Sequence, residues 1–216
     1  MRLFAIFVLL ALASIFSPGP GHLEAADMKT LLNGAMESLG EVKGSPGLCV
    51  LTDANYVNLN GKSAVGYVDL IQEVTGCSVG RGNLLFFQRK QSHPLIIALL
   101  KKDTRDCVVI RHDGREAGSV KVNIHPDSVA APGAWERVSE SLGSDAFALV
   151  NIGDAWAGGA PYDFLKCAEL HNHICPGLCS GYFIAKFIQE KYPLAEGESY
   201  SFIACPNWCK DDAVQV

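Results

Sequence analysis

The ten residues from Leu170 to Cys179 constrain this chain most, because two histidines and two cysteines fall within them. Imidazole nitrogen and thiolate sulfur are the preferred ligands of zinc and of other borderline-soft metals. The spacing of His171, His173 and Cys175 brings three such groups into one short segment. We interpret the stretch as half of a metal site, or as a reactive thiol with imidazole neighbours. The simpler alternative is a loop with ordinary histidines and buried, inert cysteines.

A helix is predicted to begin directly after Cys175. Pro176 suits the first turn of a helix, and apolar residues follow it at helical spacing, namely Leu178, Ile184, Phe187 and Ile188. Cys175 is therefore expected at a helix N-terminus, where the helix dipole and free N–H groups favour a thiolate. If the chain is an enzyme, Cys175 is the candidate catalytic residue.

A second corner rich in possible ligands follows near the end of the chain. Cys205 and Cys209 are separated by three residues, unlike the C-x2-C pairs of zinc ribbons and thioredoxin-like sites. A disulfide or an inert pair is the alternative. Because both Cys/His clusters lie in neighbouring elements of one small unit, we expect them to share a metal. Cys209 is the main candidate in this corner and Cys205 the second.

Composition narrows the class of protein. The net charge of −5 and the absence of a basic tract argue against a nucleic-acid partner. Eight cysteines in 216 residues are too few for a disulfide scaffold. Cys49, Cys107 and Cys167 could be bridged or simply buried, since connectivity cannot be read from sequence.

Residues 1–26 have the pattern of a secretory signal peptide. A basic start, Met1-Arg2, precedes an apolar run from Leu3 to Phe16, and Ala25-Ala26 offers a cleavage point. The run is short for a membrane span. We therefore expect a periplasmic or otherwise exported protein, and an uncleaved N-terminal anchor is the alternative. Apart from such an anchor, no membrane partner is expected.

Residues 27–112 are predicted to form a self-contained α+β unit. Its expected order is helix, strand, helix and three strands, with these ranges: helix 28–39, strand 47–52, helix 62–75, and strands 84–87, 94–100 and 107–111. A unit of this length is near the smallest that folds alone.

Residues 113–159 are expected to connect this unit to the second half. They are predicted to contain a strand at 120–124, a helix at 132–142 and a buried strand, Phe147–Ile152. A glycine-rich loop follows, from Asp154 to Pro161, and it is a candidate pocket wall or a simple connector.

Residues 160–216 carry the His/Cys motif. The expected elements are a short helix, 163–170, a long helix, 176–192, a strand, Tyr200–Ala204, and a helix that begins near Lys210. The last helix resembles residues 68–73, with Asp212 against Asp69 and Gln215 against Gln72. We therefore expect the second half to repeat the first and to break off before its second helix and three strands.

These residues resemble the FmdE/FwdE family of formylmethanofuran dehydrogenase-related proteins. The family hallmark F-H-G-H-x-C-P-G-L is similar to L-H-N-H-I-C-P-G-L at residues 170–178. Its D-A-I-Q motif is similar to D-A-V-Q at residues 212–215. Its motif T-G-C-x-x-G-x-G-N-L matches residues 75–84 in the first half. The resemblance covers both halves but not the middle.

The resemblance implies a fold and a metal site. The implied fold is α+β, with two α-β-α-β-β-β (FwdE/GAPDH-domain-like) units, of which the second is incomplete. The implied ligands are His171, His173, Cys175 and Cys209. The first unit lacks the His/Cys motif and has Gly66 in place of the family cysteine, so it is expected to bind no metal.

The family name also implies a place in an oxidoreductase complex whose molybdenum or tungsten pterin lies on other subunits. We therefore expect an exported zinc-binding protein, with iron as a second possible metal. It would bind a small molecule at the metal or serve as an accessory subunit, as a homodimer or in a metalloenzyme complex. The alternative is a metal- or thiol-dependent redox enzyme that uses Cys175. The sequence leaves open whether the chain is an enzyme.

Overall fold

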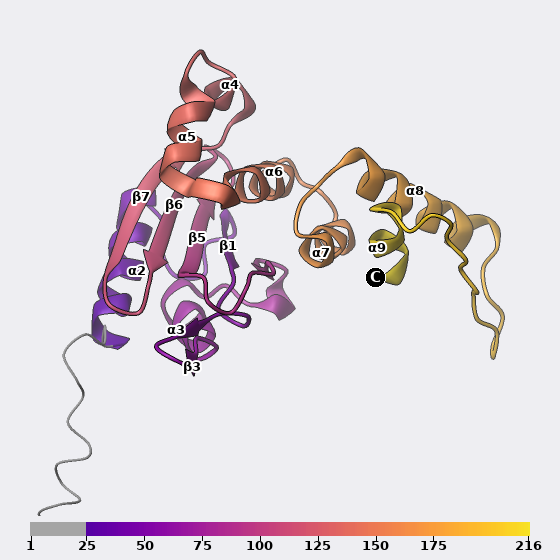
Figure 1. The fold of residues 1–216 in the computed structure, drawn as a ribbon, viewed down its shortest axis with the longest axis horizontal. Helices are drawn as coiled ribbons and strands as arrows, with labels where there is room; N and C mark the ends of the chain where they lie inside the picture. Colours follow the sequence, from indigo (N-terminus) through magenta and orange to yellow (C-terminus); the bar gives the residue numbers. More distant parts are fainter. Residues whose placement is uncertain (1–24) are drawn as a thin grey trace, which may run out of the picture.

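The computed structural model describes residues 25–216. The predicted signal peptide lies outside the described residues, except for Ala25 and Ala26, which begin helix α2 (Ala25–Leu39). In Figure 1 a twisted sheet is covered by helices, and the last helices lie to one side of it. Within the described residues, no helix is both long enough and apolar enough to span a membrane.

The sheet has five strands in the order β4-β1-β5-β6-β7. Their bounds are β1 (Leu48–Thr52), β4 (Leu84–Phe86), β5 (Leu95–Lys101), β6 (Asp106–His112) and β7 (Ala117–Asn123). β1 pairs in parallel with β4, and the other neighbouring pairs are antiparallel. Helix α3 (Gly66–Thr75) connects β1 to β4. The predicted α+β fold is confirmed, and β7 adds a strand to the sheet from the segment that we expected to be a connection.

Helix α3 begins later than the sequence pattern predicted. A small hairpin, β2 (Asn58–Leu59) with β3 (Lys62–Ser63), occupies the first residues of the expected helix. Its turn is Asn60-Gly61, and both residues have positive φ, 51° and 76°. An Asn-Gly pair with positive φ at both positions favours a two-residue hairpin turn, which explains the shorter helix.

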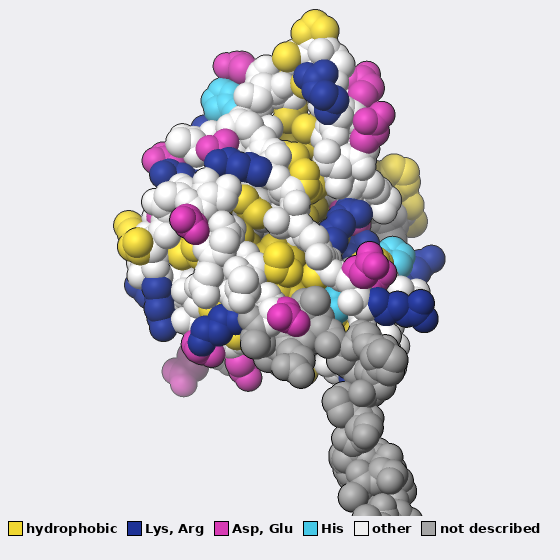
Figure 2. All heavy atoms as spheres, turned by 90° about the vertical axis from the view of Figure 1, so that its left-hand side faces the viewer, with side chains coloured by type: hydrophobic (Ala, Val, Ile, Leu, Met, Phe, Trp, Pro, Cys, Tyr) yellow, Lys and Arg dark blue, Asp and Glu magenta, His cyan; other side chains and the backbone are white. Residues whose placement is uncertain are grey.

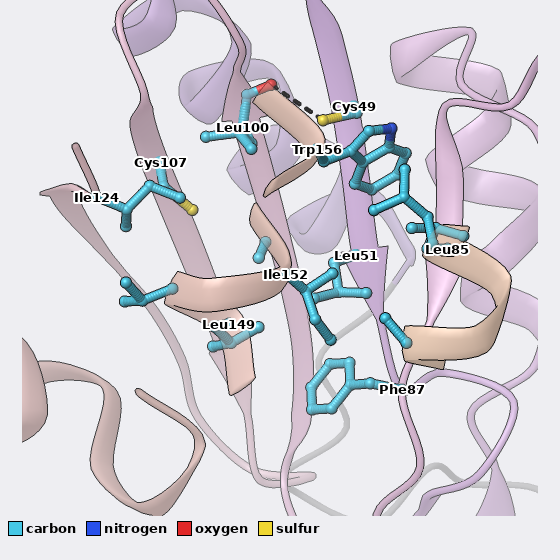
Figure 3. Packing of buried hydrophobic residues seen from close by; sticks show 14 of the residues in the cluster. Cys49, Leu51, Leu85, Phe87, Leu100, Cys107, Ile124, Leu149, Ile152 and Trp156 are labelled. Atoms are coloured by element: carbon cyan, nitrogen blue, oxygen red, sulfur yellow. Dashed lines mark hydrogen bonds between the residues drawn. The ribbon is translucent and has the colours of Figure 1, made fainter. Parts of the chain in front are cut away.

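Side chains of the strands alternate between two apolar layers. In β1, Leu48 and Val50 pack against α2 and α3, whereas Cys49 and Leu51 belong to a cluster on the opposite face. That second layer is formed by α5 (Ala134–Leu142), α6 (Ala146–Ala157) and α7 (Tyr162–His171), with the short helix α4 (Pro126–Val129) before them. Figure 3 shows side chains of α6 pointing toward the strands.

The prediction of a strand at Phe147–Ile152 is wrong, because this segment lies within helix α6. Its buried side chains recur at helical spacing and include Leu149, Ile152 and Trp156. Phe147, in contrast, is exposed. A short apolar run fits either a strand or a buried helix, and here the following residues extend the helical pattern.

The prediction of a strand at Tyr200–Ala204 is also wrong. These residues pair with no strand in the described structure, and Phe202 and Ile203 are exposed. Between residues 160 and 216 the structure contains α7, α8 (Pro176–Lys191) and α9 (Lys210–Gln215), and no strand. A second α-β-α-β-β-β unit is therefore not confirmed, although α8 and α9 begin where they were predicted.

Exposed apolar side chains are concentrated on α8 and the segment that follows it, which we call the apolar arm surface. In Figure 1 this part lies farthest from the sheet. Figure 2 views the opposite side, near α2 and β7, where charges of both signs surround a narrow hydrophobic strip. The apolar arm surface comprises Phe183, Ile184, Phe187, Tyr192, Leu194, Tyr200, Phe202, Ile203 and Trp208.

A buried ion pair joins the sheet to its helical layer. Arg89, after β4, binds the Asp53 carboxylate at 2.9 Å and the Asp145 carboxylate at 2.9 Å. The Asp53 side chain is fully buried, and the Arg89 side chain is 7% exposed. Burial raises the pKa of Asp53, while the N–H of Ile96 and the Arg89 guanidinium oppose that shift.

We expect Arg89→Ala to lower the free energy of unfolding by about 3–5 kcal/mol, because it leaves a buried carboxylate without its cation. Without Arg89 the folded-state pKa of Asp53 rises further. The loss should therefore be larger at neutral pH than in acid, where the carboxyl is protonated in both states. Urea unfolding measured at several pH values tests this. Arg115→Ala, at an exposed site, should change stability by less than about 0.5 kcal/mol.

Candidate metal centre

Helix α7 is attached to the edge of the sheet by polar side chains. The Tyr162 hydroxyl donates to the carbonyl of Leu84 at 3.2 Å. The Glu169 carboxylate accepts from the N–H of Phe86 at 2.9 Å. These bonds satisfy backbone groups of β4, an edge strand that would otherwise leave them unpaired. They also fix the position of His171, the last residue of α7.

The chain reverses direction between α7 and α8. Asn172 ends α7 in the left-handed conformation, with φ 66°, and its side-chain oxygen accepts from the N–H of Gln88 at 3.0 Å. Asparagine tolerates this conformation better than most residues. Three residues later Cys175 caps α8, and its sulfur accepts from the N–H of Leu178 at 3.4 Å. The predicted position of Cys175 at a helix N-terminus is thus what the structure shows.

Cys209 reaches the same place from the far end of the chain, as the residue that caps α9. Two glycines of α8 permit the close approach. A Cβ atom on Gly177 would lie 2.7 Å from Cβ of Cys209, and one on Gly181 would lie 2.7 Å from Cα of Lys210. Neither position has room for a larger side chain, because real Cβ contacts are longer than this.

His171, Cys175 and Cys209 form one group of possible metal ligands. One ligand atom from each residue lies within 4.8 Å of the other two, and all three residues are partly buried. Nε2 of His171 is 3.5 Å from Sγ of Cys175. The other ring nitrogen of His171, Nδ1, is 2.6 Å from a carboxylate oxygen of Asp212 in α9.

The other two candidate ligands lie outside this group. The His173 ring lies beside the His171 ring, with centroids 4.4 Å apart and the ring planes tilted by 36°, and it also contacts Phe147 of α6. Desolvation lowers the pKa of His173, and the neighbouring His171 lowers it further. Cys205 is exposed and is not part of the ligand group.

The two thiols of the group interact with each other. The hydrogen bond with Cys175 raises the pKa of Cys209, and desolvation and the charge of Cys175 act in the same direction. All eight cysteines are free, and Cys49, Cys77, Cys107 and Cys167 are buried. Burial raises the pKa of each of these four thiols, that of Cys107 to about 12. They are therefore packing residues, and the possible bridges among Cys49, Cys107 and Cys167 are not formed.

The donor set defines the class of site. One imidazole and two thiolates suit zinc and other borderline-soft metals, whereas magnesium and calcium require oxygen ligands. Three protein ligands with a fourth position left over are typical of zinc sites that bind a water molecule or a substrate. The three donors therefore form a candidate site for a transition metal.

The same part of the chain has a family match. Residues 170–216 match the family model described as FmdE, molybdenum formylmethanofuran dehydrogenase operon. This confirms the predicted resemblance for the segment that holds all three ligands. Searches of curated proteins and of solved structures gave no match.

Sequence reasoning did not assign a role to Gly177, Gly181 or Asp212. The two glycines are four positions apart and so lie on one face of α8, which is a pattern that permits close helix contact. Asp212 is three residues after Cys209, within one turn of the same helix. The sequence contains these spacings, but it does not show which helices pack against each other at these residues.

We expect Gly181→Ala to abolish or strongly weaken metal binding, because the added methyl group meets the backbone of Lys210 and moves α9 away from Cys175. Overpacking of this kind costs roughly 1–3 kcal/mol. The matched control is Gly34→Ala in α2, where a Cβ atom has nothing within 4 Å. That control should gain roughly 0.5–1 kcal/mol. Metal titration and thermal unfolding of both variants give the comparison, and unchanged metal binding in Gly181→Ala would contradict this account of the centre.

Proposed function

We propose that this chain is an exported metal-binding protein that holds one zinc ion through Nε2 of His171 and the sulfurs of Cys175 and Cys209. The observation that supports it is the convergence of these three donors within 4.8 Å. Export rests on the signal-like pattern of residues 1–26, and fractionation of cells that express the full chain tests it.

The open position is proposed to bind a small molecule. A metal ion in such a site acts as a Lewis acid toward the ligand that completes its coordination. Iron is the second candidate metal, because imidazole and thiolate ligands also suit it. His173 lies beside His171 and is partly buried, which supports a role for it in contacting a ligand bound at the open position.

A thiol-dependent redox activity of Cys175 is the alternative proposal. Its support is the position of the Cys175 sulfur, which accepts an N–H bond at the start of α8 and lies beside Nε2 of His171. A helix N-terminus and an imidazole both favour a thiolate nucleophile. The neighbouring Cys209 would then serve as the second thiol of a disulfide.

Metal analysis of the chain, purified under reducing conditions, distinguishes the two proposals. We expect about one zinc per chain in the wild type and almost none in His171→Ala, Cys175→Ala or Cys209→Ala. Cys205→Ala, which changes an exposed cysteine outside the group, should retain the metal. A wild-type chain without metal, in which Cys175 and Cys209 are found as a disulfide, would overturn the zinc proposal and favour the redox one.

The apolar arm surface supports a second role, as part of an assembly. Helix α8 buries Leu178 and Gly181 against its own chain but exposes Phe183 and Phe187 on another face. Large exposed apolar patches mark interaction sites. We propose that a second copy of the chain covers this surface, because twofold homodimers are the commonest soluble assemblies.

We expect sedimentation velocity to give a dimer for the wild type and a monomer for the double variant Phe183→Glu, Phe187→Glu, since a charge cannot be buried in an apolar interface without a large cost. The control is Val42→Glu, which places the same charge on an exposed apolar residue outside the arm and should leave the dimer intact. A wild-type chain that stays monomeric at all concentrations would contradict self-association.

A further inference from the structure

We infer that Asp212 is a positioning residue that sets the tautomer and orientation of His171 for the metal, and that Gln215 holds Asp212 in place. This inference rests on the proposed metal function. Asp212 is not one of the three grouped ligands, and it acts through the ring nitrogen of His171 that faces away from Cys175.

The two ring nitrogens of His171 have different partners. Nε2 faces the sulfur of Cys175 at 3.5 Å, on the side of the ligand group. Nδ1 faces the Asp212 carboxylate at 2.6 Å. A carboxylate only accepts hydrogen bonds, so it selects the tautomer in which Nδ1 carries the proton and Nε2 has a free lone pair. That tautomer is the one that can donate Nε2 to a metal ion.

The contact between His171 and Asp212 is shielded from water more than an ion pair on the protein surface is. The side chain of His171 is 11% exposed and that of Asp212 is 35% exposed, so water screens the bond only in part. A carboxylate behind a ligating histidine fixes the ring and raises the basicity of the ligand nitrogen, and loss of such a partner typically costs 10- to 100-fold in metal affinity.

Gln215 extends the chain of hydrogen bonds by one link. Its side-chain amide donates to the second carboxylate oxygen of Asp212 at 3.4 Å, across three positions of α9. One oxygen of Asp212 is thus directed to His171 and the other to Gln215. The candidate ligand Cys209 is the N-cap of the same helix. Helix α9 therefore supplies one ligand, Cys209, and also the residue that orients another ligand, His171.

The first half of the chain contains an aspartate, Asp69, that can serve as a control for Asp212. Asp69 and Gln72 have the same spacing in the first turns of α3 as Asp212 and Gln215 in α9. Gly66 precedes Asp69 by three residues, as Cys209 precedes Asp212. Asp69 is exposed, and its helix lacks the cysteine cap. Asp69→Asn therefore removes the same charge from the first turn of a helix as Asp212→Asn does. Unlike Asp212→Asn, it does so at a position that has no histidine ligand beside it.

The test is the zinc affinity of the full chain, measured by competition with a chromophoric chelator. Four proteins are compared, namely wild type, Asp212→Asn, Asp212→Ala and the control Asp69→Asn. We expect affinity to fall roughly 10- to 100-fold in Asp212→Ala and less in Asp212→Asn, whose amide oxygen still accepts from Nδ1. Asp69→Asn should bind as the wild type does.

Cobalt(II) substitution separates positioning from a general loss of structure. Sulfur-to-cobalt absorption should persist in the Asp212 variants, because both thiolates remain, while the ligand-field bands shift with the altered imidazole. Equal zinc affinity and equal cobalt spectra in Asp212→Ala and the wild type would overturn the inference and leave the proposed metal function intact. A wild-type chain that binds neither metal would overturn both.

Discussion

The attachment of α7 to the free edge of β4 is the contact on which the metal centre depends. The sheet is built from β1, β4 and the antiparallel strands, and its edge would otherwise expose the backbone groups of Leu84 and Phe86. Tyr162 and Glu169 bind those groups. The same helix then ends at His171, so the sheet edge and the first metal ligand are fixed by one element.

From that anchored helix the centre is assembled by close helix contacts. Asn172 turns the chain, Cys175 begins α8, and the small residues of α8 let α9 approach until Cys209 faces Cys175. The described structure contains no strand beneath α8 and α9. Their relative position therefore rests on contact between helices, on the pairing of His171 with Asp212, and on any metal that the three donors bind.

The sequence predicted the local parts of this arrangement better than the contacts between them. Spacing alone placed Cys175 at a helix N-terminus, because proline and the apolar pattern behind it are local signals. It misassigned Phe147–Ile152, since a segment of six mostly apolar residues has no period that separates strand from helix. Tyr200–Ala204 has the composition of a strand but lacks a neighbouring strand to pair with. The roles of Gly181 and Asp212 depend on which helices meet, and local periodicity carries no such information.

The two sulfurs of the centre belong to residues 34 positions apart (209 − 175), and the chain between them contains all of α8 and the apolar arm surface. A metal ion held by both would be a reversible cross-link across that loop. In the loop-entropy description of cross-links, closing a loop of this length is worth roughly 3–4 kcal/mol. Such a metal cross-link would also keep α9 attached to the start of α8 after a protease cuts the segment between them. A chelator that removes the metal would then release α9.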